Sequence, residues 1–108
     1  MGPLEYSTIR ERIVGVLRSS ERPLTAEEIS GLLGLNLPPK DIYEHILHAA
    51  KSLRSESGGR ELIVMEPPYC RKCGYVFKDL TKPKKPSKCP RCKSEWIAPP
   101  RFAIIKRG

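Results

Sequence analysis

The chain has 108 residues and a formal net charge of +8, which comes from 20 basic and 12 acidic residues. This length suits one small domain, with or without an appendage, and excludes two large ones. Its apolar runs are far shorter than the roughly 18 residues that a membrane helix needs, and its first residues are charged where a secretory signal is apolar. We therefore expect a cytoplasmic protein. Glutamine is absent and asparagine occurs once, at Asn36, which is typical of proteins from thermophiles.

Charge is distributed unevenly along the chain. Residues 1–59 carry a net charge of −1, whereas residues 60–108 carry +9. Hydrophobic periodicity changes at the same place, from a helical pattern to short β-prone runs between prolines. This asymmetry predicts a polyanionic partner for the C-terminal half.

The first helix is expected to begin at Ser7 or Thr8, because Thr8 and Glu11 fit a capping box. It should end near Ser19 or Ser20, where the apolar pattern stops. Its apolar residues recur on one face, as in an amphipathic helix. These residues are Ile9, Ile13, Val14 and Leu17.

A stronger start signal precedes the second predicted helix, which covers residues 26–33. Thr25 and Glu28 form a capping box in the sequence LTAEEI. Leu24 and Ile29 occupy the two positions of a hydrophobic staple. The glycine that follows this segment is a suitable stop, and a turn over residues 35–38 comes next.

The third helix is predicted to begin at Pro39. Amide hydrogens in the first turn of a helix have no intrahelical partner, so the missing amide hydrogen of proline costs nothing there. Asp41 lies near the positive end of its dipole, and the helix should end near Ser55. We expect the buried face to hold Ile42, Ile46, Ala49, Ala50 and Leu53. We expect the exposed face to hold Glu44, Leu47, His48, Lys51 and Ser55, with Tyr43 and Arg54 at its margins.

Two β-prone runs follow, Glu61–Glu66 and Arg101–Lys106, each with a proline pair on the side that faces the cysteines. We expect these runs to pair antiparallel, with the intervening residues as an elaborate hairpin tip. The predicted division is a helical domain with its first strand at 1–66, a cysteine-containing segment, the ribbon, at 67–100 and a return strand at 101–108.

Four cysteines in the C-terminal half have the spacing C-x2-C-x15-C-x2-C: Cys70, Cys73, Cys89 and Cys92. This spacing predicts one structural zinc ion held by four thiolates. Iron in the same cage, which would make the protein a small electron carrier, is an alternative. Two disulfides or a redox motif are others, but they need an oxidising compartment or a thioredoxin-type strand and helix around the motif, and the sequence indicates neither. Gly74 follows the first pair where such a turn favours a left-handed residue, and Lys93 occupies the equivalent place after the second.

The ribbon contains few sizeable apolar residues, so we expect its fold to depend on the metal. We expect those residues to cover the metal site rather than to stack on bases. They are Tyr75, Val76, Phe77, Trp96 and Ile97. Because protein sulfurs occupy all four ligand positions, none is open to activate water, and we expect no enzymatic activity.

Three helices, the second of them capped, followed by two strands resemble a winged helix-turn-helix domain in which the strands form the wing. The segments CRKCG and CPRC are similar to the two knuckles of a rubredoxin-like zinc ribbon. Together they resemble the archaeal predicted transcriptional regulators in which a winged helix-turn-helix is fused to a zinc ribbon. The resemblance runs from about Ser7 to Lys106 and implies an α+β fold and a DNA-binding transcription regulator or transcription-associated protein. The long turn before the third helix and the ribbon at the wing tip depart from the usual winged helix.

Two groups of residues are candidates for contact with duplex DNA. Those of the third helix are suited to reading bases and anchoring on phosphates: Lys40, Tyr43, His48, Lys51 and Arg54. Those of the ribbon offer phosphate contacts: Lys82, Lys84, Lys85, Lys88, Arg91 and Lys93. The alternatives are a protein-interaction module of a transcription complex, a merely solubilising basic surface and a second metal site at His45 and His48. Neither a membrane nor a small-molecule substrate is indicated.

Overall fold

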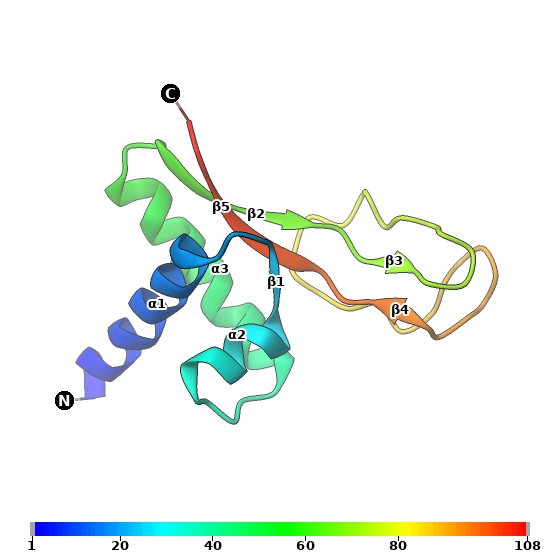
Figure 1. Ribbon diagram of the computed structural model, residues 1–108, viewed down its shortest axis with the longest axis horizontal. Helices are drawn as coiled ribbons and strands as arrows, with labels where there is room; N and C mark the ends of the chain where they lie inside the picture. The colour runs from blue at the N-terminus through cyan, green and yellow to red at the C-terminus, as the bar shows by residue number, and fades with distance from the viewer. Residues whose placement is uncertain (1, 108) are drawn as a thin grey trace.

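The computed structural model describes residues 2–107, with side chains from Ile9 onward. Three helices come first, α1 (Gly2–Ser19), α2 (Ala26–Leu33) and α3 (Pro39–Glu56). The strands are β1 (Leu24–Thr25), β2 (Glu61–Glu66), β3 (Tyr69–Cys70), β4 (Ile97–Ala98) and β5 (Arg101–Lys106). Figure 1 shows the helices gathered around one end of β2 and β5, with the ribbon of β3 and β4 projecting from the other end. No helix in the described part of the chain is long and apolar enough to cross a membrane.

Helix α1 begins at Gly2, so its predicted start at Ser7 or Thr8 and the capping box with Glu11 are wrong. Pro3 lies in the first turn, where its missing amide hydrogen removes no helical hydrogen bond. No glycine or second proline follows before the apolar stripe, so the helix extends back to this point. The end of α1 at Ser19 agrees with the prediction.

Helix α2 has the termini that its sequence predicts. The Thr25 hydroxyl accepts a hydrogen bond from the Glu28 amide at 3.1 Å, and the Glu28 carboxylate accepts one from the Thr25 amide at 3.0 Å. Leu24 and Ile29 are both buried in the same cluster, as a staple requires. Gly34 closes the helix in the left-handed conformation, with φ at 68°.

Helix α3 starts at Pro39 as predicted and ends at Glu56. Two positions differ from the predicted faces, because Leu47 and Ala50 are both half-buried. They line a small hollow together with Pro83, which belongs to the long loop of the ribbon. That loop lies too far along the chain for helical periodicity to reveal it. The fully buried side of α3 is otherwise as expected and consists of Ile42, Ile46, Ala49 and Leu53.

The predicted pairing of the two long strands is confirmed, since β2 and β5 form an antiparallel ladder from Glu61 opposite Lys106 to Glu66 opposite Arg101. Strand β1, which pairs antiparallel with β5, was not predicted. Strand β5 is therefore central in a sheet of order β1-β5-β2. A strand of only two residues has no alternation that could reveal it.

The ladder continues into the ribbon without a change of register. Glu66 pairs with Arg101 at the end of β2 and β5, and Tyr69 pairs with Ala98 in β3 and β4, at the same offset. Between these pairs each strand has two prolines, which cannot donate ladder hydrogen bonds. The ribbon is therefore an extension of the β2–β5 hairpin after a proline break.

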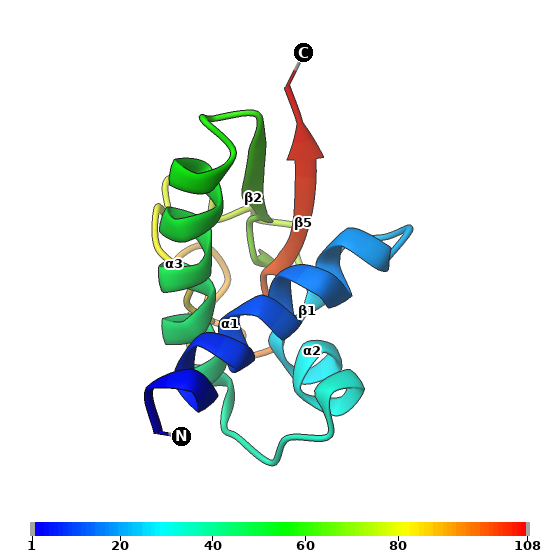
Figure 2. The same ribbon diagram turned by 90° about the vertical axis from the view of Figure 1, so that its left-hand side faces the viewer.

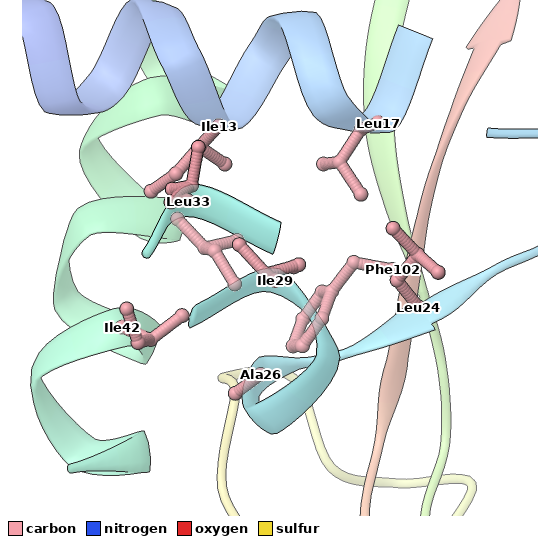
Figure 3. Packing of buried hydrophobic residues seen from close by; sticks show 9 residues of the cluster. Ile13, Leu17, Leu24, Ala26, Ile29, Leu33, Ile42 and Phe102 are labelled. Carbon is pink, nitrogen blue, oxygen red and sulfur yellow. The ribbon is translucent and has the colours of Figure 1, made fainter. Parts of the chain in front are cut away.

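Buried residues form two separate clusters. The larger one joins all three helices to the sheet, and Figure 3 shows Phe102 of β5 among the side chains of the helices. Figure 2 shows α3 running alongside β2 and β5 while α1 crosses in front of them. Members of this cluster are Ile13, Leu17, Leu24, Ala26, Ile29, Leu33, Ile42, Ile46 and Phe102. The smaller cluster lies within the ribbon, around the cysteines, and shares no residue with the first.

Candidate metal centre and nucleic-acid interface

The four cysteine sulfurs converge on one point, within 4.8 Å of one another. The sulfurs of Cys70 and Cys92 are 3.5 Å apart, and those of Cys73 and Cys89 are 3.6 Å apart. A tetrahedral zinc ion with bonds of about 2.3 Å needs sulfurs roughly 3.8 Å apart. The cage therefore fits one structural zinc ion.

Each cysteine pair closes a turn with the same backbone geometry. Gly74 donates its amide hydrogen to the carbonyl of Cys70, and Lys93 donates to the carbonyl of Cys89, both at 2.9 Å. Both donors are left-handed, with φ at 83° for Gly74 and 68° for Lys93. Glycine adopts this conformation freely, whereas lysine does so at a steric cost. The second knuckle thus keeps its geometry despite the less suitable residue.

The thiols of the cage differ in their pKa values. Burial opposes the thiolate of Cys70, but backbone amides of its own turn outweigh this effect and lower its pKa to about 6. Burial opposes the thiolate of Cys89 too, and amides of the second turn still lower its pKa. At Cys92 the amide of Ser94 favours the thiolate, yet burial and the neighbouring sulfurs raise the pKa to about 11. A divalent cation relieves this competition, because it stabilises all four thiolates together.

Apolar side chains cover the cage only in part. Tyr75 and Phe77 pack on it with Ile97, as predicted, and their rings meet edge to face at 5.1 Å. Val76 and Trp96 do not cover it, since they are 44% and 62% exposed. Successive side chains of an extended segment point to opposite faces. Val76 lies between two inward residues and Trp96 next to inward Ile97, so this alternation was the signal that could have placed them outside.

The ribbon loop, residues 78–88, folds back onto α3. A cleft of about 450 Å³ lies between them. Its four lysines outnumber its two glutamates. Residues from α2 and α3 that line it are Glu27, Pro39, Lys40, Tyr43, Glu44 and Leu47, and those from the loop are Lys82, Pro83, Lys84 and Lys85. The structure therefore brings lysines of both predicted groups to one surface.

Other predicted contact residues lie elsewhere. Lys51 and Arg54 line a shallow hollow at the C-terminal end of α3, and His48 is exposed but lines neither this hollow nor the cleft. Exposed basic residues around the second knuckle do not line the cleft; they are Lys88, Arg91 and Lys93. His45 and His48 belong to no group of three or more potential metal ligands among the described residues.

Tyr43 has a structural role that its helical position alone did not predict. It is half-buried, and its ring centroid lies 6.1 Å from that of Phe102. Burial, together with the nearby charge of Glu27, raises the pKa of its phenol. Tyr43 therefore packs against the core while it lines the cleft.

Both halves of the chain match known protein families. The N-terminal PF0610-like family matches residues 8–63, and the PF0610 rubredoxin-like zinc β-ribbon domain matches residues 67–107. The solution NMR structure of protein PF0610 from Pyrococcus furiosus is 33% identical, with a TM-score of 0.71 over 94% of this chain and 91% of that one. No curated protein matches the sequence. The chain therefore belongs to the PF0610-like family, with three helices, small antiparallel sheets and a rubredoxin-like zinc ribbon.

Proposed function

We propose that this protein binds duplex DNA as a transcription regulator or transcription-associated protein, with zinc holding the ribbon in place. The observation that carries this proposal is the position of the ribbon loop, whose Lys82, Lys84 and Lys85 share a cleft with Lys40 of α3. Attraction to phosphate dominates sequence-independent binding to DNA. Lysines from two distant segments on one surface are suited to contact one phosphate backbone.

These lysines are available for such contacts. In the part of the chain with described side chains, the ion pairs join Arg18 to Glu61 and Arg22 to Glu28. None of the ribbon lysines takes part in either pair. Among the side chains that the structure describes, none forms an ion pair with these lysines, so the region around them can attract a polyanion.

The winged helix-turn-helix assignment belongs to the same proposal. It is supported by the chain order of three helices followed by the β2–β5 hairpin, and by β1, which joins the start of α2 to that hairpin. Five residues, 34–38, separate α2 from α3, which is a longer turn than is usual in this motif. The ribbon takes the place of a simple wing tip (Figure 1).

The proposed contacts divide between phosphates and bases. A recognition helix reads base edges mainly from its N-terminal residues. Here the ribbon loop lies over that half of α3, so we assign phosphate contacts to the loop lysines and base contacts to exposed His48 and Lys51 farther along the helix. The basic residues around the second knuckle add long-range attraction.

One observation favours the alternative of a protein-interaction module. Glu27 and Glu44 line the same cleft, where they repel phosphate, and half-buried Leu47 gives it an apolar wall. In either case we propose a binding protein rather than an enzyme, because four cysteine ligands leave a zinc ion without an open position for chemistry.

Titration of duplex DNA at a series of salt concentrations tests the proposal. Changing Lys82, Lys84 and Lys85 together to alanine should weaken binding to every sequence and flatten the plot of log affinity against log salt by about 0.9 for each lost contact. A matched control removes three exposed charges at the end of the β2–β5 hairpin where Glu61 pairs with Lys106, far from the ribbon: Arg60, Lys106 and Arg107.

The control should change the slope less than the loop variant does. An equal slope for wild type and loop variant would contradict the phosphate role of the loop. If the wild type shows no affinity for duplex DNA even at low salt, the interaction module becomes the better explanation.

A further inference from the structure

One face of the ribbon sheet, opposite the metal, carries large apolar side chains in solvent. Tyr69 is 39% exposed, Val76 44% and Trp96 62%. Single exposed apolar residues are common on protein surfaces, but a group on one face indicates a binding surface. This group is notable in a ribbon whose own buried cluster is so small. We call Tyr69, Val76 and Trp96 the outer face.

Strand register places these side chains together. Tyr69 is paired with Val76 on one side and with Ala98 on the other. The ladder ends at Cys70 and Ile97, and directly beyond it the Arg71 amide donates to the Trp96 carbonyl at 2.9 Å, so the two segments stay hydrogen-bonded at Trp96. Paired residues of antiparallel strands share a face, and diagonal neighbours lie within reach of aromatic side chains.

The backbone that carries the outer face is fixed from both sides. The Trp96 amide donates to the Ser94 hydroxyl at 3.1 Å, and its carbonyl accepts from Arg71. The alternate residues Cys70 and Ile97 are buried against the metal cage. Trp96 therefore projects from an ordered backbone, and a ligand that stacks on its ring need not order the chain first.

Charge around the outer face indicates the kind of ligand. Residues 67–100 contain nine basic residues and only two acidic ones, Asp79 and Glu95. Arg71 is hydrogen-bonded through its backbone to Trp96, and both Arg71 and the next residue, Lys72, are exposed. Exposed aromatic rings can stack on flat apolar rings of a ligand, and the surrounding positive charges attract an anionic backbone.

We propose that the outer face binds single-stranded nucleic acid, with unpaired bases stacking on Trp96 and Tyr69 and with Arg71 contacting phosphate. Bases of a duplex are stacked on one another, so their faces are not free for this contact. The inference goes beyond the proposed duplex contact and uses a different surface, and the two can fail separately.

The first test uses the fluorescence of the zinc-loaded full chain. Trp96 is its only tryptophan, so all tryptophan emission reports on the outer face. A 12-nucleotide oligothymidylate should quench this emission, and a 12-base-pair duplex at the same salt should quench it much less. Equal quenching by the duplex, or quenching by polyglutamate and not by the single strand, would overturn the proposal.

The second test compares variants by anisotropy of the labelled oligothymidylate. Trp96→Ala should weaken binding about tenfold, because stacking on one aromatic ring contributes strongly to single-strand affinity. Trp96→Phe should retain most of the affinity. As a control, Leu32→Ala removes an apolar side chain of α2 that is 65% exposed and should leave binding unchanged.

Two further measurements separate the outer face from the loop. Arg71→Ala should reduce the salt slope for the single strand by about 0.7. Trp96→Ala should leave duplex affinity unchanged, whereas the triple lysine variant should lower it. Equal zinc content in wild type and Trp96→Ala shows that the ribbon is intact, and oligothymidylate binding within twofold of wild type in that variant would refute the proposal.

Discussion

Removal of zinc should unfold the ribbon and leave the helices folded. The reason is that the two buried clusters share no residue, so loss of the cage removes no side chain from the helical core. Structural zinc contributes an apparent ~10 to 16 kcal/mol to the folding of such modules. In the ribbon, Tyr75, Phe77 and Ile97 are the apolar side chains that cover the cage. At ~1.5 to 3 kcal/mol each, their burial does not replace the metal.

Amide NMR of the full chain before and after chelation measures this. Signals of residues 69–98 should lose dispersion, whereas those of α1, α2 and α3 should keep it. The ladder between β2 and β5 should persist near Phe102, which is buried among the helices, and fray near Glu66. The same spectra after re-addition of zinc serve as the control for reversibility. Dispersed ribbon signals without metal, or joint collapse of the helices, would refute the reasoning.

Two more predictions concern the start of α2. Thr25→Ala should lower the free energy of unfolding by about 1 kcal/mol in urea, because it removes the cap that the Glu28 amide uses, while the same change at exposed Thr81 should have little effect. An unchanged midpoint would contradict the role of the cap. The ion pair with Arg22 and the Thr25 amide lower the pKa of Glu28 to about 2, so its stabilisation is present above the unfolded pKa and is lost as pH falls toward 2. The difference in unfolding free energy between wild type and Glu28→Gln should therefore shrink between pH 5 and pH 2, and a constant difference would contradict it.

Elements with local signals were predictable from the sequence. Helix α2 carries its start and stop within ten residues, 25–34, so no distant contact was needed to place it. The β2–β5 pairing followed from two β-prone runs with proline pairs at matching ends. The start of helix α1 was misplaced because Thr8 and Glu11 fit a capping box and also fit the interior of a helix. The helix runs through both residues, so the capping box does not form.

For the candidate site, the metal ligands were predictable and their surroundings were not. The spacing of the cysteines fixes which sulfurs can meet one ion. It does not reveal that the ribbon loop returns to α3, and so it could not show that Leu47 is half-buried or that Lys40 has loop lysines as neighbours. Such contacts join positions far apart in the chain, and no periodicity encodes them. The exposure of Trp96 was within reach, because alternation beside buried Ile97 predicts it.

Zinc fixes where the basic residues of the ribbon lie, because it holds the ribbon folded. Residues 67–100 carry nine basic and two acidic residues, so their mutual repulsion opposes any compact state of this segment. The free energy of metal binding stabilises the folded state of such a module. It offsets both the charge repulsion and the conformational entropy that is lost when the loop becomes ordered. Only a folded ribbon places Lys82 and Lys84 beside α3 and fixes the backbone at Trp96, directly before β4. The positive charge persists without zinc, but its arrangement does not. Nonspecific attraction to nucleic acid should therefore survive chelation, whereas the separate duplex and single-strand contacts proposed above require the metal.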